Sequence, residues 1–136
     1  DTLRQKSRPY LFSNSLAPSV VCASSKAIEI LKESTDLIKK ITLNTKYFRK
    51  EIKKLGFEIK SGTHPIVPIM LYDASLATQV SQDMLELGIY VVGFSYPVVP
   101  KKEARIRVQI SADHSKKHLM QALDAFYKCG KKYGLI

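Results

Sequence analysis

Two arginines near the end of the chain are the side chains best suited to bind a ligand. Arg105 and Arg107 lie in a segment, residues 105–110, in which polar and apolar side chains alternate. This alternation predicts a β-strand that carries both arginines on one face. Arginine keeps its charge and can hold a carboxylate or a phosphate with two parallel hydrogen bonds. The segment therefore predicts either a binding site for a small anion or a solvated sheet face.

Other chemical signals in the sequence are weak. His114 and His118 are four residues apart, so both could face one metal ion on a helix, but no third ligand is evident. His64, which precedes Pro65, could line a pocket or cap a turn. The sequence contains no GxSxG motif, no P-loop and no GxGxxG motif. Its own residues therefore predict an anion-binding surface, with no metal site and no catalytic centre.

A short polar segment precedes the first long helix that the sequence predicts. Ser13, Asn14 and Ser15 lie just before Pro18, and proline suits the first turn of a helix. Small polar side chains at this position can cap the helix, and the free N–H groups of a helix start can bind a phosphate. The segment predicts either an ordinary cap or a phosphate-binding turn.

Composition narrows the class of protein. The chain has 136 residues and is 45% hydrophobic, enough for one ordinary domain with a core. No apolar run approaches the roughly 20 residues that span a bilayer, so no membrane partner is expected. The formal net charge is +10, but the lysines fall mostly in helical segments without an aromatic–basic platform, so nucleic acid is not expected either. Cys22 and Cys129 lack metal-ligand spacing and predict reduced thiols.

Hydrophobic periodicity predicts an α+β fold. Apolar residues at three- and four-residue steps or in alternation predict helices at about 18–33, 35–55, 75–87 and 115–126, and strands at 57–60, 66–71, 89–92 and 105–110. Asp73 or Ser75 can cap the third of these helices, and the fourth starts at Asp113 or Ser115. Pro97 and Pro100 make the connection before the last strand irregular, and Pro68 favours an edge strand or an irregular position. This order is typical of a small, mostly antiparallel sheet covered on one face by helices, with a long N-terminal linking helix.

Three segments, in this order and at these separations, resemble a known family. They are RPYLFSNSLAPSVV, GFSYPVVP and ARIRVQISADHS. They are similar to the C-terminal part of the glycine C-acetyltransferases (2-amino-3-ketobutyrate coenzyme A ligases), α-oxoamine synthases of the pyridoxal-phosphate-dependent fold type I. The resemblance covers essentially the whole chain. It implies that residues 1–17 connect to a preceding large domain and that residues 18–136 form the C-terminal small domain with its linking helix.

The resemblance also implies roles for individual residues. Arg107, the second arginine of the RIR triplet, would bind the carboxylate of the amino-acid substrate, and Arg105 would have a structural or electrostatic role. Phe12 and Ser13 would reach the phosphate of the cofactor held by the partner subunit of a homodimer. Residues 94–100 would form a wall of the substrate cleft. The catalytic residues, including the cofactor-binding lysine, would precede this chain, so no catalytic residue is expected here.

The implied reaction joins glycine and acetyl-CoA to give 2-amino-3-oxobutyrate and CoA, a step in threonine breakdown. Pyridoxal 5'-phosphate would be the cofactor of the complete enzyme. This chain alone is expected to be inactive and to bind no cofactor, because none of its lysines has the glycine-rich setting that the cofactor requires. The implied compartment is the mitochondrial matrix or the cytoplasm. The residues alone leave an alternative, a stand-alone α+β domain that binds a small anion through Arg105 and Arg107.

Overall fold

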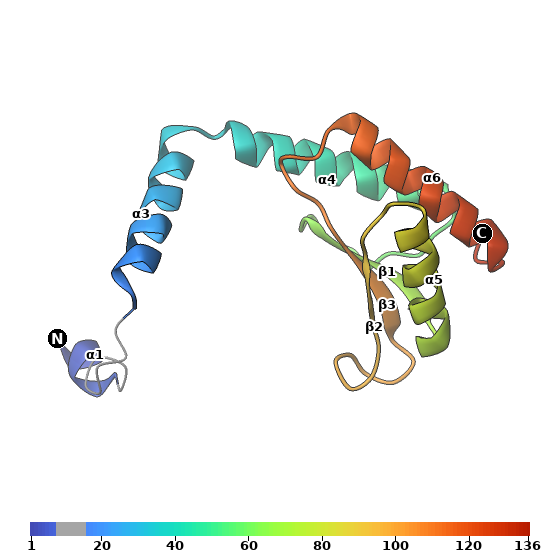
Figure 1. The fold of residues 1–136 in the computed structure, drawn as a ribbon, viewed down its shortest axis with the longest axis horizontal. Helices are drawn as coiled ribbons and strands as arrows, with labels where there is room; N and C mark the ends of the chain where they lie inside the picture. Colours follow the sequence, from blue (N-terminus) through green and yellow to red (C-terminus); the bar gives the residue numbers. More distant parts are fainter. Residues whose placement is uncertain (8–15) are drawn as a thin grey trace. The chain divides into compact units, whose positions relative to one another are not determined.

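The computed structural model describes residues 1–7 and 16–136, which divide into two units (Figure 1). The first unit, Asp1–Asp36, contains helices α1 (Thr2–Lys6) and α3 (Pro18–Glu33). The second unit, Leu37–Ile136, contains α4 (Asp36–Lys54) except for its first residue, together with all the elements that follow. In the part of the chain that the structure describes, no helix combines the length and the apolar character needed to cross a bilayer.

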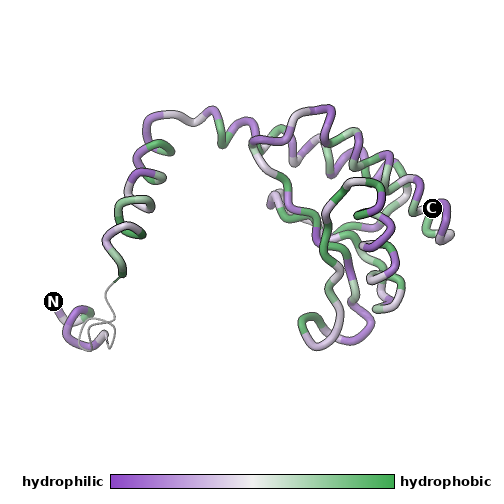
Figure 2. The backbone as a smooth tube through the Cα atoms, in the orientation of Figure 1, coloured by the Kyte–Doolittle hydropathy of each residue, from purple (hydrophilic) through white to green (hydrophobic). Residues whose placement is uncertain are grey.

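Helix α3 spans the residues that the sequence predicts, with Pro18 in its first turn. Its N-cap is Ala17, which makes no side-chain hydrogen bond, and the polar residues 13–15 predicted to cap it lie outside the described residues. None of its residues is buried, and Figure 2 shows hydrophobic positions recurring along it. Its exposed apolar side chains are Val20, Val21, Ile28, Ile30 and Leu31. Because most helices depend on packing of an apolar face, we expect other polypeptide to cover α3.

The second unit is built on a three-stranded antiparallel sheet with the strand order β1–β3–β2 (Figure 1). Its strands are β1 (Ile66–Tyr72), β2 (Val92–Phe94) and β3 (Ala104–Gln109). Strand β3 comes last in the sequence but lies between the other two and pairs antiparallel with both. Strands β1 and β2 therefore run parallel to each other, and α5 (Ala74–Glu86) is the crossover that connects them.

One face of this sheet is covered by helices α4, α5 and α6 (Lys116–Lys132). In β3, Ile106 and Val108 are buried whereas Arg107 and Gln109 are exposed, as the alternation predicts. Their burial creates a core to which the sheet and all three helices contribute. Its most buried large side chains are Phe48, Ile52, Val67, Ile69, Val80, Met84, Ile106 and Phe126. The predicted fold class, an α+β layer with helices on one face of a small antiparallel sheet, is confirmed.

At the starts of α5 and α6 the structure selects Asp73 and Ser115 from the pairs of starting residues that the sequence predicts. Asp73 Oδ1 accepts a hydrogen bond from the Leu76 N–H at 2.7 Å, and Ser115 Oγ accepts one from the His118 N–H at 3.3 Å. The His118 side chain completes the second cap by accepting from the Ser115 N–H. Each cap supplies an acceptor for an N–H group that has no partner within its helix.

The predicted strand at residues 57–60 is reduced in the structure to a single bridge, between Ile59 and Ile69. The cause lies opposite, in β1. Pro68 accepts a hydrogen bond from the Lys60 N–H at 3.2 Å but has no N–H to return. The Lys60 carbonyl instead accepts from Arg49 Nη1 at 2.9 Å. As predicted from Pro68, β1 is an edge strand of the three-stranded sheet.

The predicted buried strand at residues 89–92 is wrong. Strand β2 begins only at Val92, and Tyr90 is 80% exposed. At this end of the sheet, pairing with the β1 side continues beyond β3, since the Ile110 N–H bonds to the Pro65 carbonyl at 3.0 Å. On the other side of β3, residues 89–91 form a connection instead of a strand. A short apolar run cannot by itself distinguish these two structures.

Gly93 in β2 packs directly against the backbone of α5. A Cβ at this position would lie 2.9 Å from the Ala77 carbonyl oxygen and 3.2 Å from its carbonyl carbon. Because these atoms belong to a helix backbone, we expect Gly93→Ala to lower the free energy of unfolding by roughly 1–3 kcal/mol. Denaturant unfolding followed by circular dichroism measures this change. Val92→Ala is the control, with an expected loss below about 1 kcal/mol, and equal losses in both variants would contradict the close approach.

Candidate functional site

The candidate site lies on the outer face of the sheet, which α4, α5 and α6 leave uncovered. Arg105 and Arg107 share this face because they are two residues apart on β3. Arg107 lies opposite Pro68 of β1 and Val92 of β2. Since β3 is paired on both sides, its backbone holds the two arginine side chains at a defined separation. This confirms the strand that the sequence predicts and the shared face of its arginines.

An open pocket of about 280 Å³ lies beside these side chains. We call it the arginine pocket, and its lining residues are Pro68, Phe94, Val98, Val99, Arg105 and Arg107. It combines apolar side chains from the proline-rich segment with two guanidinium groups. The segment predicted to wall the cleft thus contributes to the same pocket as both arginines. Such a combination can hold the charged end of a small molecule against an apolar wall.

Arg107 is the pocket arginine whose hydrogen-bond donors are all free among the described residues. Its guanidinium carbon lies 4.3 Å from the centre of the Phe94 ring, a cation–π contact that restricts where the side chain can lie. Within residues 1–7 and 16–136 it makes no ion pair and no hydrogen bond, and it is exposed. All its donors are therefore available to an anionic ligand.

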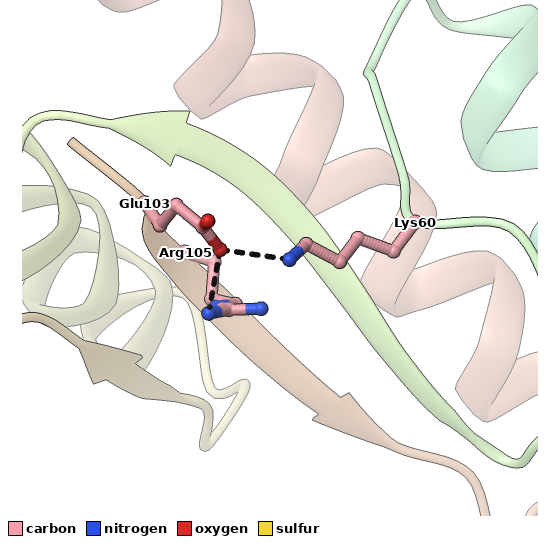
Figure 3. A network of polar contacts seen from close by, with 3 residues as sticks. All are labelled: Lys60, Glu103 and Arg105. Carbon is pink, nitrogen blue, oxygen red and sulfur yellow. Dashed lines mark hydrogen bonds and ion pairs between the residues drawn. The ribbon is translucent and has the colours of Figure 1, made fainter. Parts of the chain in front are cut away.

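Arg105, in contrast, is already paired with a carboxylate. Its Nη2 donates to Glu103 Oε2 at 3.2 Å, and Lys60 Nζ contacts the same oxygen at 2.8 Å (Figure 3). The hydrogen bond from Lys60, with a smaller contribution from the charge of Arg105, lowers the pKa of Glu103. The carboxylate is therefore charged at neutral pH. No sequence pattern predicts a role for Glu103 or Lys60, and only the position of Glu103 two residues before Arg105 indicates a possible pair.

Two of the predicted binding residues cannot be placed. Phe12 and Ser13, together with their neighbours Asn14 and Ser15, lie outside the described residues. Their contact with a cofactor phosphate therefore stays a prediction. Arg107 is placed, but its predicted contact with a substrate carboxylate also stays a prediction.

The histidines have structural contacts. Nδ1 of His64 accepts from the Ile66 N–H at 3.0 Å, so this residue caps a turn. His114 and His118 accept, also through Nδ1, from backbone N–H groups three residues earlier in the chain. Among the described residues, no three histidine, cysteine, aspartate or glutamate side chains are grouped so that they could hold a metal ion. Cys22 and Cys129 are free thiols, and burial raises the pKa of Cys129.

A larger cavity of about 430 Å³ lies between the start of α6 and the end of β3. Its lining is mainly apolar and includes the fully buried Phe48 and Phe126, with His114 and His118 among its polar members. None of its lining residues is a lysine, arginine, aspartate or glutamate. The smaller arginine pocket is therefore the better candidate site for an anionic ligand.

Comparison with known proteins places the chain in a family. Residues 1–126 match the family model "Aminotransferase class I and II". The chain belongs to this family. It is 51% identical over 134 residues to the mitochondrial 2-amino-3-ketobutyrate coenzyme A ligase of Mus musculus, and this match covers 98% of this chain and 32% of the relative. It is 50% identical over 136 residues to the 8-amino-7-oxononanoate synthase of Thermosipho melanesiensis, covering 100% of this chain and 35% of the relative.

Solved structures show the same relationship. The chain superimposes on Sphingomonas wittichii serine palmitoyltransferase with a TM-score of 0.91 at 28% identity, covering 99% of this chain and 34% of that one. The 8-amino-7-oxononanoate synthase of Francisella tularensis gives a TM-score of 0.81 at 26% identity, over 98% of this chain and 39% of that one. The chain thus corresponds to only part of each relative's length. The predicted resemblance to pyridoxal-phosphate-dependent transferases of this family is confirmed.

Proposed function

We propose that this chain is the C-terminal part of an acyltransferase that joins glycine and acetyl-CoA to give 2-amino-3-oxobutyrate and CoA. The observation that carries this proposal is the free guanidinium of Arg107, which is stacked on Phe94 beside an open pocket. The relatives support the reaction, since one at 51% identity is a 2-amino-3-ketobutyrate coenzyme A ligase. The family match over residues 1–126 favours this proposal over a stand-alone anion-binding domain.

In this proposal Arg107 binds and orients the amino acid. Two parallel hydrogen bonds from its guanidinium to the carboxylate would fix both the position and the rotation of the substrate. Phe94 would keep the guanidinium in place through the cation–π contact, at 4.3 Å from the ring centre. The apolar side chains of Val98 and Val99 would exclude water from that ion pair. Glycine has no side chain to hold, so orientation through its carboxylate is especially important.

The described residues fit the carboxylate end of an amino acid but do not by themselves form a cofactor site. No lysine and no acidic residue lines the arginine pocket. Pyridoxal 5'-phosphate supplies an electron sink for the α-carbon when it is bound in the complete enzyme. We propose that the polypeptide beyond this chain holds most of the cofactor. In a homodimer, Phe12 and Ser13 would contribute to the phosphate site of the partner subunit.

The same proposal covers domain organisation and compartment. Residues 1–17 would connect to a large domain, and residues 18–136 would form the small domain with its linking helix. The exposed apolar side chains of α3 support additional covering polypeptide, and the mouse relative is longer than this chain, which spans 32% of it. Curated relatives include a mouse enzyme named as mitochondrial and one from Escherichia coli, so we propose the mitochondrial matrix or the cytoplasm.

A second candidate function is the synthesis of 8-amino-7-oxononanoate. It is favoured by the Thermosipho melanesiensis relative, which at 50% identity is almost as similar as the mouse ligase. A carboxylate-binding Arg107 would suit either enzyme, since this chain is similar to relatives of both kinds. The acyl donor and the product therefore separate the two candidates.

The deciding experiment is a product assay on the full-length protein supplied with pyridoxal 5'-phosphate. We expect CoA release from acetyl-CoA that depends on glycine, with 2-amino-3-oxobutyrate identified by mass spectrometry after chemical reduction. The 136-residue chain, assayed in parallel, is expected to give no turnover. Absence of glycine-dependent CoA release in the full-length protein would reject the proposed reaction, and formation of 8-amino-7-oxononanoate from a longer acyl-CoA would support the second candidate.

A further inference from the structure

The two arginines of the arginine pocket differ in one respect that bears on ligand choice. Both line the pocket, but only Arg105 has a carboxylate partner, Glu103. The Arg105 side chain is 15% exposed, and the Glu103 and Lys60 side chains are 40% and 46% exposed. Figure 3 shows Arg105 and Lys60 reaching Glu103 from different parts of the chain. A single glutamate, shared with Lys60, thus pairs with one of the two pocket arginines and leaves Arg107 without a carboxylate partner among the described residues.

The backbone determines the position of this glutamate. The Glu103 N–H bonds to the Pro100 carbonyl at 3.1 Å, which closes the turn immediately before β3. Lys102 within that turn has a φ of 63°, a conformation that few non-glycine residues adopt. On the other side, the Lys60 N–H bonds to the Pro68 carbonyl of β1 at 3.2 Å. The turn before β3 therefore positions the Glu103 carboxylate beside Arg105, and the segment paired with β1 positions Lys60 on its other side.

Arg105 retains unused hydrogen-bonding capacity. Its Nε is buried and has no hydrogen-bond partner among the described residues, and it makes one contact with Glu103 through Nη2. Residues two apart on a strand are separated by about 7 Å, which is close enough for both guanidinium groups to contact one small molecule. Without the negative charge of Glu103, the pocket would present two cations to a ligand with two carboxylates.

We propose that Glu103, held by Lys60, restricts the arginine pocket to ligands with a single carboxylate. Glu103 does so by occupying Arg105, so that a second carboxylate would have to displace it. Glu103 is thus a specificity-determining residue that acts through Arg105, and a monocarboxylate such as glycine meets only Arg107. This inference rests on the proposed function of Arg107 as the carboxylate-binding residue.

The test uses the full-length enzyme with Glu103→Gln, which keeps the shape of the side chain and removes its charge. The probes are malonate and propionate. Each has three carbons, but malonate carries two carboxylates and propionate one, and both are measured as competitive inhibitors against glycine. In the variant we expect the inhibition constant of malonate to fall about tenfold, because a second charged pair becomes available. That of propionate should stay within about twofold. Calorimetric titration of both anions into the cofactor-free protein provides a readout independent of turnover.

Two further variants identify the cause. Glu58→Gln removes a nearby carboxylate that bonds to the Tyr72 hydroxyl instead of an arginine, and it should change neither inhibition constant. Glu103→Gln combined with Arg105→Gln should lose the gain in malonate binding. Arg105→Gln alone covers the case in which Glu103→Gln fails to fold. It should leave malonate binding unchanged, since Arg105 is already occupied.

The outcomes separate this inference from the proposed function. Equal changes for malonate and propionate in Glu103→Gln, no change for either, or a gain that persists without Arg105 would overturn the inference. Weaker malonate binding in Arg105→Gln would also overturn it. The proposed function fails separately if the Arg107→Ala variant binds propionate and glycine as tightly as the unmodified enzyme does. If their binding requires Arg107 but Glu103→Gln has no selective effect, only the role of Glu103 is rejected.

Discussion

Replacing Arg107 with alanine in the full-length enzyme should lower kcat/KM for glycine by about 10²- to 10³-fold. The variant would lose two charge-assisted hydrogen bonds to the substrate carboxylate, worth roughly 3–4 kcal/mol of transition-state binding. Arg107 is exposed in this chain, so an effect of this size requires the rest of the enzyme to exclude water from the pair. Steady-state kinetics with glycine as the varied substrate measure the loss.

Arg107→Lys is the matched variant. Lysine keeps the positive charge but lacks the planar fork and stacks less well on Phe94, so we expect only partial recovery of kcat/KM. The KM for acetyl-CoA should stay within about twofold in both variants, because Arg107 is proposed to contact only the amino acid. Near-normal kcat/KM for glycine in either variant would remove Arg107 from this role.

The largest stability effect is expected for Phe126→Ala in α6. Phe126 has no exposed surface, and its ring packs edge-on against Phe57 at 5.7 Å and Phe48 at 6.3 Å between ring centres. Removing the ring leaves a cavity where α4, α6 and the segment after α4 meet. We expect a loss of about 3–5 kcal/mol in the free energy of unfolding. Guanidinium denaturation of the 136-residue chain, followed by circular dichroism, measures this loss.

Tyr127→Ala is the control for this prediction. Tyr127 is the next residue on the same helix, has a ring of similar size and is 45% exposed. Its truncation should cost less than about 1 kcal/mol, since this exposed ring buries much less apolar surface than the ring of Phe126. Comparable losses in the two variants would mean that α6 packs through a different face.

Local sequence patterns predicted most of the helices and the arginine strand. The 18–33 helix, the helix starts near Asp73 and Ser115 and the inward-facing Ile106 and Val108 all follow from interactions within a few residues of each other. Such interactions depend on side-chain spacing, which a sequence shows directly. Where a partner from a distant segment was needed, as at residues 57–60 and 89–92, the sequence pattern was insufficient.

The sequence by itself determined that two arginines share one face of a strand, and its motifs led to the family that the comparisons confirm. Only the tertiary structure decided which arginine is free. Lys60 and Glu103 are 43 residues apart, and they meet because the edge segment and the turn before β3 reach the same place through backbone pairing across β1. Contacts of this kind depend on strand order and register, which no spacing along the chain encodes.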